Sequence, residues 1–357
     1  MSTMLGRPLL LGGLAFAFLF RANASAQDAS GRLITSAAIA VNPRTHIVYA
    51  VDEPADAVVV TDEATGAVTR VAVEKGPIAL AVIPSVNKIY VVNADSNSIS
   101  IVDGASNTVI KTIRGGSHPY TIAANQKTQK VYVTYTYDHI TTVIDGTSDV
   151  ASTLNTGSAD TIAVDEANNT LFLSTYEDAD LRIVDVATGA MHKIKVGGHI
   201  WGFAFDATQR VLYLAHTGTM DVLGFDAKTE KTFVIPVGKL PCAVALDTAM
   251  HKLYAVNYED HTLSVIDTAK RKVVAVLPLG DHPQAVAVDV RGNRIYVANV
   301  HGNNVTVVDG SKDTVVGTFP AGDGPYALAV DGVTGRAYAA VYGPAGPVRV
   351  DIPLLAK

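Results

Sequence analysis

The feature that most constrains this chain is an internal repeat of 40 to 42 residues. Beside each repeated aromatic residue, an alanine stands nine residues earlier and an aspartate thirteen residues later. Periodicity of this length is typical of architectures in which each unit buries its apolar face against its neighbours. The aromatic residue lies within an apolar run and returns at eight positions: Tyr49, Tyr90, Tyr132, Phe172, Tyr213, Tyr254, Tyr296 and Tyr338.

Each unit has the pattern of four short strands. In the seventh unit, the β-branched segments QAVAVD, RIYVANV, NVTVVDG and TVVGTF are separated by Gly, Asn and Asp. No amphipathic helix pattern appears after residue 26. Four strands in about 41 residues are the signature of a propeller blade. We therefore predict an all-β fold in which residues 27–357 form one β-propeller of four-stranded blades. Eight blades fit the repeat count, and seven are the alternative.

The repeated residues have structural roles in such a blade. We expect the alanine on the first strand, where blades converge, and the aromatic residue between neighbouring sheets. The aspartate is expected to end the third strand, where its carboxylate can accept backbone N–H bonds and set the next turn. The last unit stops at IPLLAK without a fourth strand. We predict that the segment 31–36, GRLITS, supplies it and closes the ring.

The first 26 residues differ from the repeats. Arg7 is followed by an apolar run from Leu9 to Phe20 and by small residues up to Ala26. This pattern predicts a cleaved secretory signal peptide, residues 1–26, and a periplasmic or secreted protein. The apolar run is too short to span a bilayer, and no later segment resembles a membrane span.

Composition excludes several classes of function. Cys242 is the only cysteine, so neither an intramolecular disulfide nor covalent C-x-x-C-H haem attachment is available. Without residues 1–26 the chain has 26 basic and 34 acidic side chains, a net charge of -8. An acidic protein is a poor general binder of nucleic acid. The G-x-S-x-G, H-E-x-x-H, P-loop and dinucleotide-binding motifs are all absent from the sequence.

The segments NKIYVVNADSNSISIVDGASNTVIKTI and GDHPQAVAVDVRGNRIYVANVHGNNVTVVDGSKDTVVGTF resemble the YVTN family of bacterial and archaeal β-propeller repeats. The resemblance covers nearly all of the chain after residue 26. It implies an exported propeller, in a family that includes surface-layer proteins, single-stranded-DNA-binding propellers and relatives of cofactor-binding or oxidoreductase propellers. The Tyr-Val-x-Asn motif is retained as YVVN, YAVN and YVAN in units two, six and seven. Units three to five have YVTY, FLST and YLAH.

Three histidines occupy one position of the repeat, fourteen residues before the aromatic residue. They are His118, His199 and His282, in units three, five and seven, which places them a quarter turn apart around the mouth of an eight-bladed channel. Histidine is a common metal ligand, so these three are the candidate metal-binding residues. Their separation favours a haem-like or other planar cofactor, or a divalent metal held by two ligands with an acid such as Asp138 or Glu259. The alternative is a turn element copied by duplication.

Variable residues gather on the same face of the predicted ring. The loop into the first strand and the loop between strands two and three share one face, and seven of the ten histidines fall there. A repeat with a regular core and an irregular rim is typical of a binding face. Two residues after the histidine position the side chain is again varied: Tyr120, Asp160, Trp201, Cys242, Gln284 and Tyr326. The candidate ligand-binding residues are Tyr120, Tyr137, Asp138, His139, Trp201, His216, Tyr258, Glu259, His261 and His301.

Three functions are compatible with this pattern. The first is a non-catalytic exported propeller that binds a protein, glycan, small molecule or cofactor through the His- and Tyr-rich face. The second is a metal-assisted hydrolase or lyase with Asp138, Asp160 or Glu259 as base, which follows from analogy with other propellers. The third, by family resemblance, is binding of single-stranded nucleic acid, in which aromatic side chains stack on bases. We rank the third last, because acidic residues in the same loops repel phosphate.

Overall fold

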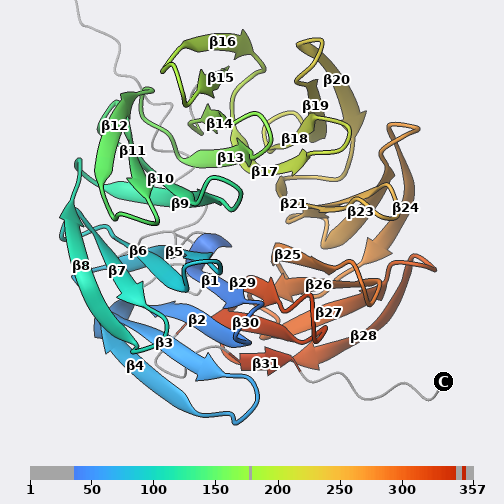
Figure 1. Cartoon of the computed structure of the whole chain (residues 1–357). Helices are drawn as coiled ribbons and strands as arrows, with labels where there is room; N and C mark the ends of the chain where they lie inside the picture. Colours follow the sequence, from blue (N-terminus) through green and yellow to red (C-terminus); the bar gives the residue numbers. More distant parts are fainter. Residues whose placement is uncertain (1–35, 177–178, 343–347, 351–357) are drawn as a thin grey trace, which may run out of the picture.

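The computed structural model describes residues 36–176, 179–342 and 348–350, and their strands form eight antiparallel sheets arranged in a ring (Figure 1). Consecutive strands pair in sequence order within each sheet. Seven sheets have four described strands and the last has three. The prediction of an eight-bladed propeller is confirmed, and the seven-bladed alternative is excluded. Residues 31–35 of the segment predicted to close the ring lie outside the described residues, as does the predicted signal peptide.

The inner strands of the eight blades lie side by side around the axis of the ring (Figure 1). The repeated alanine lies on the inner strand directly opposite the repeated aromatic residue, as in the pair Ala245 and Tyr254. A small side chain at this position leaves room for the neighbouring blade. The inner strands are β1 (Ile39–Asn42), β5 (Pro77–Ile83), β9 (Pro119–Asn125), β13 (Thr161–Asp165), β17 (Ile200–Asp206), β21 (Pro241–Asp247), β25 (Pro283–Asp289) and β29 (Pro325–Val330).

The second strands form the core of the blades. All eight repeated aromatic side chains lie on these strands and are at most 3% exposed, packed among aliphatic residues of adjacent sheets. Burial of a side chain of this size contributes about 1.5–3 kcal/mol. The second strands are β2 (Ile47–Asp52), β6 (Lys88–Asn93), β10 (Lys130–Tyr135), β14 (Thr170–Ser174), β18 (Val211–His216), β22 (Lys252–Asn257), β26 (Arg294–Asn299) and β30 (Ala337–Val341).

The third strands end at the repeated aspartates. Oδ1 of Asp103 accepts the N–H groups of Ala105 and Ser106 at 3.0 and 2.7 Å, and these bonds hold the turn to the fourth strand and lower the pKa of Asp103. The expected role is therefore present, and the last aspartate, Asp351, lies outside the described residues. The third strands are β3 (Ala57–Asp62), β7 (Ser98–Asp103), β11 (Ile140–Asp145), β15 (Asp180–Asp185), β19 (Asp221–Asp226), β23 (Thr262–Asp267), β27 (Asn304–Asp309) and β31 (Val348–Val350).

The fourth strands form the outer edge of the ring, and most of their side chains are exposed. Two short 3-10 helices, η1 (Ser36–Ala38) and η2 (Glu53–Ala55), accompany the first blade. In the described residues, no helix has the length and apolarity needed to cross a membrane. The fourth strands are β4 (Val68–Ala72), β8 (Thr108–Arg114), β12 (Ala151–Asn155), β16 (Met191–Lys195), β20 (Lys231–Pro236), β24 (Lys272–Pro278) and β28 (Thr314–Pro320).

Side chains join the first blade to the eighth. His46, in the turn after β1, lies 2.5 Å from Asp331, in the turn after β29. Glu63 accepts hydrogen bonds from the Tyr338 hydroxyl at 3.1 Å and the Thr334 hydroxyl at 2.9 Å. The two residues of each pair are more than 270 positions apart in the chain. These hydrogen bonds therefore join the two ends of the ring in addition to the packing between them.

Candidate functional site

The loops between blades carry the histidine position in one backbone conformation. His118, His199 and His282 have φ values of 59°, 65° and 50°, in the left-handed region. The same position in other blades has Gly76, Leu240 and Gly324, also with positive φ. This region favours glycine and disfavours most other side chains. The backbone conformation therefore restricts which residues can stand at this position, whatever the histidine side chains bind.

The left-handed residue is held by the preceding blade. At four of these positions the backbone N–H donates to a side chain in the loop between the second and third strands of that blade, so each bond connects two neighbouring blades. The N–H of His199 donates instead to the Tyr176 carbonyl at 2.8 Å. Three of the four acceptors are Asn or Asp oxygens, and the fourth is Nδ1 of a histidine. The donor and acceptor pairs are Gly76 and Asp56 at 2.9 Å, His118 and Asn97 at 2.8 Å, His282 and His261 at 3.1 Å, and Gly324 and Asn303 at 2.9 Å.

The asparagine of the Tyr-Val-x-Asn motif fixes the same loops from within the blade. Oδ1 of Asn257 accepts the N–H of Gly238 at 3.2 Å, and its amide donates to Thr262 and Ser264 at 3.0 and 2.9 Å. Asn299 and Asn93 make related bonds. The motif is therefore structural. In the fifth blade His216 stands at this position, is only 3% exposed and lies 3.3 Å from Asp221.

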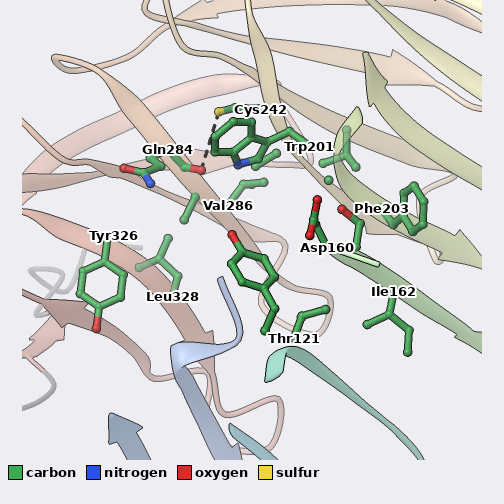
Figure 2. Close-up of a pocket in the computed structure, with 16 residues that line it drawn as sticks. Thr121, Asp160, Ile162, Trp201, Phe203, Cys242, Gln284, Val286, Tyr326 and Leu328 are labelled. Carbon is green, nitrogen blue, oxygen red and sulfur yellow. Dashed lines mark hydrogen bonds between the residues drawn. The ribbon is translucent and has the colours of Figure 1, made fainter. Parts of the chain in front are cut away.

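The channel contains a cavity of about 310 Å³ (Figure 2). The side chains that vary two positions after the left-handed residue line its wall, together with smaller residues further along the same strands. Tyr120 and Trp201, both predicted ligand-binding residues, are among them. The variable lining residues are Tyr120, Asp160, Trp201, Cys242, Gln284 and Tyr326, one from each of six successive inner-strand ends.

Burial determines the chemistry of several cavity groups. Desolvation and the nearby Asp160 raise the pKa of Tyr120 to about 12, so its phenol stays protonated. Burial also raises the pKa of Cys242 to about 12, which makes its thiol a poor nucleophile. Oε1 of Gln284 is buried and has no hydrogen-bond partner within the described part of the chain. Asp160 accepts the N–H of Tyr176 at 3.2 Å.

Aromatic contacts connect the cavity to the loops at its mouth. The ring of Tyr176 lies 5.5 Å from Trp201 in the cavity wall and 4.9 Å from His199 at the rim. Tyr258 packs in one cluster with Cys242 and lies 4.8 Å from His282. The cavity and the predicted His- and Tyr-rich face thus form one continuous site.

The three histidines predicted as a metal set do not meet. The ring of His118 lies 5.1 Å from Tyr137, whereas His199 contacts Tyr176. Within the described residues, His118 and His199 belong to no group of three possible ligands. His282 instead lies beside two predicted ligand-binding residues, 4.9 Å from His261 and 4.2 Å from His301 between ring centres.

The remaining predicted residues occupy the outer loops. Tyr137 is 68% exposed, and His139 and Glu259 are also exposed. Asp138 accepts the N–H of Ser117 and so fixes the loop before β9. Of the three candidate bases, Asp138, Asp160 and Glu259, only Asp160 lines the cavity.

Three residues of this region are not among the predicted site residues. Tyr176 bridges the cavity and the rim, Tyr342 lies 4.7 Å from Tyr326, and Asp281 lies 2.7 Å from His282. The sequence does contain a signal for the contact between His261 and His282. His261 and His282 are 21 residues apart, the same separation as Asn97 and His118. Residues at this separation meet across a joint between blades.

The solved structures to which this chain is similar include two with informative names. Hydrazine synthase of Kuenenia stuttgartiensis is 21% identical, with a TM-score of 0.61 over 88% of this chain and 94% of that chain. Dihydro-heme d1 dehydrogenase NirN, in complex with DHE, is 11% identical, with a TM-score of 0.72 over 92% of this chain and 78% of that chain. At these identities the likeness concerns the fold. No curated sequence matches the chain.

The family comparison agrees with the repeat pattern and the eight-bladed ring. The motif strands, the paired alanine and aromatic residues and the turn aspartates recur through the region that it covers. The sequence model of the YNCE-like beta-propeller matches residues 16–333, and the chain belongs to that family.

Proposed function

We propose that this protein is an exported recognition propeller that binds a planar small molecule or cofactor in the cavity at its channel mouth. The observation that carries the proposal is the cavity of about 310 Å³, lined by one variable residue from each of six blades. Its volume lies at the lower end of the range of about 300–1,000 Å³ typical of small-molecule sites. The signal-like segment 1–26 supports the export part of the proposal.

The cavity wall favours a ligand with a flat apolar body and hydrogen-bond donors. Tyr120 and Trp201 offer aromatic surface, while the Asp160 carboxylate and Gln284 Oε1 offer acceptors. Among the described lining residues none is Lys or Arg. A neutral or cationic ligand therefore fits better than a phosphate-bearing one. Single-stranded nucleic acid is disfavoured as well, because the acidic side chains of Asp138 and Glu259 lie in loops of the same face and repel phosphate.

A haem-type cofactor is the second candidate. NirN, solved in complex with DHE, has the same fold, and imidazoles at the rim such as His199 are of the type that ligates haem iron. Such a ligand would be held by the rim, where these imidazoles lie. The single cysteine leaves non-covalent binding as the mode of attachment.

The first test is to purify the untagged protein from its native compartment and record its absorption spectrum and the mass spectrum of an extract. A planar compound at about one per chain supports the proposal, and a Soret band identifies it as haem-type. Trp201 is the only tryptophan of the chain, so its fluorescence reports on the cavity directly. Quenching on titration with the recovered compound gives its affinity.

Variants separate the cavity from the rest of the surface. D160N and Q284L change cavity polarity without changing side-chain size greatly, and each should weaken binding at least tenfold. H192Q is the control, because His192 lies on the exposed outer strand β16, where it pairs with Glu230 and does not line the cavity. Wild-type affinity in both cavity variants would refute the proposal for the cavity. Loss of a haem-type ligand only in the triple variant H118G, H199G and H282G would move the site to the rim.

A further inference from the structure

Four side chains gather at the mouth between the sixth and seventh blades, and they are named here the rim cluster: His261, Asp281, His282 and His301. They come from three loops, those between β22 and β23, between β24 and β25, and between β26 and β27. His261 and His282 are partly exposed, so an ion can reach them from solvent.

The distances within the rim cluster are close to those of a metal site. Nδ1 of His261 lies 3.4 Å from Oδ1 of Asp281, and Nδ1 of His282 lies 2.7 Å from the same oxygen. Ligand atoms of these three residues all lie within 4.8 Å of one another. Tetrahedral ligands at about 2.1 Å from zinc are separated by about 3.4 Å. One small shift of the His282 ring would therefore admit an ion.

The fourth residue adds an independent observation. Nε2 of His301 is buried and has no hydrogen-bond partner within the described residues, while its ring lies 4.2 Å from that of His282. A buried polar atom without a partner is uncommon in a folded protein, and a bound water or ion is one explanation for it. His301 is not among the three residues whose ligand atoms lie within 4.8 Å of one another, so it would become the fourth donor only after its ring turns toward His282.

The backbone holds the three loops in register. The N–H of Leu279 donates to the His261 carbonyl at 2.8 Å, and the N–H of Val300 donates to the His282 carbonyl at 3.0 Å. The N–H of His282 donates to His261 Nδ1 at 3.1 Å. A site whose supporting backbone is fixed loses little entropy when it binds an ion. The bond to His261 Nδ1 is the one that an ion would displace.

A second group of acids and histidine, His46, Glu63 and Asp331, serves as a contrast. Glu63 there already accepts bonds from Thr334 and Tyr338 and lies 3.8 Å from Arg336. Its ligand atoms are occupied by the ring closure. Within its described ion pairs, Asp281 faces only His261 and His282, the two residues that would share the ion with it.

We propose that the rim cluster binds one divalent transition-metal ion of the zinc type, with His261, His282 and Asp281 as ligands and His301 as the fourth. A donor set rich in imidazole favours zinc, copper or nickel over magnesium or calcium. The rim cluster adjoins the cavity but supplies none of its lining residues, and the proposal goes beyond the function proposed for the cavity.

The test uses untagged full-length protein stripped with chelator and titrated with Zn²⁺, followed by Co²⁺ absorption as a report on coordination. Wild type should bind one Zn²⁺ per chain and give the strong visible bands of tetrahedral Co²⁺. Two variants remove a ligand and keep the backbone. H282G places at residue 282 the residue that Gly76 and Gly324 supply elsewhere, and H261N places the acceptor that Asn97 and Asn303 supply.

Each of these two variants should weaken Zn²⁺ binding at least 100-fold and abolish the Co²⁺ bands, while the melting temperature changes little. H118G, at the same left-handed position in the third blade, should bind Zn²⁺ like wild type. Absence of stoichiometric Zn²⁺ binding in wild type, or wild-type affinity in H282G and H261N, would overturn the proposal. Equal loss in H118G would overturn it as well, because the ion would then be held by the alternate-blade histidines.

Discussion

Nδ1 of His46 lies 2.5 Å from Oδ2 of Asp331, although the two residues are 285 positions apart in the chain. The pair bridges the first and eighth blades, where a propeller must close to protect its edges. The pKa of His46 is raised, chiefly by its hydrogen bond to Asp331, and that of Asp331 is lowered despite its burial by its bonds to His46 and the following backbone. The closure is thus linked to pH.

The first prediction concerns that linkage. A raised histidine pKa adds stability that is complete below the ordinary value of 6.5 and is lost as pH rises through the raised pKa. The lowered carboxyl pKa adds stability above 3.8 that is lost as pH falls. The His46–Asp331 pair, which joins the first blade to the eighth, should therefore stabilise the fold most between those two values. In urea unfolding, wild type should lose more stability than H46N between pH 5.5 and pH 8.

H46N is a matched variant, because Asn87, Asn169 and Asn293 stand at the same left-handed turn position in other blades. Identical pH profiles of wild type and H46N would show that the pair contributes nothing to closure. A thermal melt of H46N at pH 8 close to that of wild type serves as the control for folding.

The second prediction tests the turn aspartates. D103A removes the oxygen that accepts two backbone N–H groups and should cost about 1–2 kcal/mol of unfolding free energy. D103N retains an amide oxygen and should cost less than half as much. Urea denaturation of both variants measures the difference. A cost below about 0.5 kcal/mol in D103A would contradict the role assigned to the repeat.

The third prediction tests the motif asparagine. Asn257 is fully buried and bonds to Gly238, Thr262 and Ser264. N257A leaves these buried groups without their partner, so the free energy of unfolding should fall by about 2–4 kcal/mol. N257D keeps one acceptor and loses both donors, and it should also destabilise the protein. A near-neutral N257A, measured by urea denaturation, would mean that water replaces the side chain.

The fourth prediction concerns the thiol. Cys242 is 8% exposed, has a pKa raised to about 12, and its Sγ lies 3.6–3.8 Å from the carbonyls of Val256, Pro283 and Gln284. The native protein should not react with a thiol reagent at pH 8 within hours, and the urea-unfolded protein should react at one equivalent. Rapid reaction of the native protein would restore Cys242 as a candidate nucleophile.

The architecture could be predicted from the sequence because every blade is built from the same repeated pattern of residues. The pairing of Ala245 with Tyr254 and the turn at Asp103 are local consequences of residue type and spacing, and both recur in blade after blade. The variable cavity wall was also predictable, since Tyr120 and Trp201 occupy equivalent positions after the left-handed residue.

The arrangement of the rim was harder to predict. The repeat placed His118, His199 and His282 at equivalent points of the ring. Positions related by rotation about the ring axis lie apart from one another, so these three side chains do not meet. The contact of His282 with His261 depends on a bond across a joint, and the burial of His301 depends on how two loops pack. His216, a predicted ligand-binding residue, is buried, so packing within its blade determines where its side chain lies.

The left-handed residue in the loops between blades has a consequence for how such a protein can evolve. Six described joints share one backbone conformation while they carry glycine, leucine or histidine, as at Gly76, Leu240 and His282. Duplication of a blade copies the joint together with its permissive position. Each copy is then free to gain or lose an imidazole by single substitutions that leave the ring intact, so a lineage can change the chemistry of its rim without first finding a new fold.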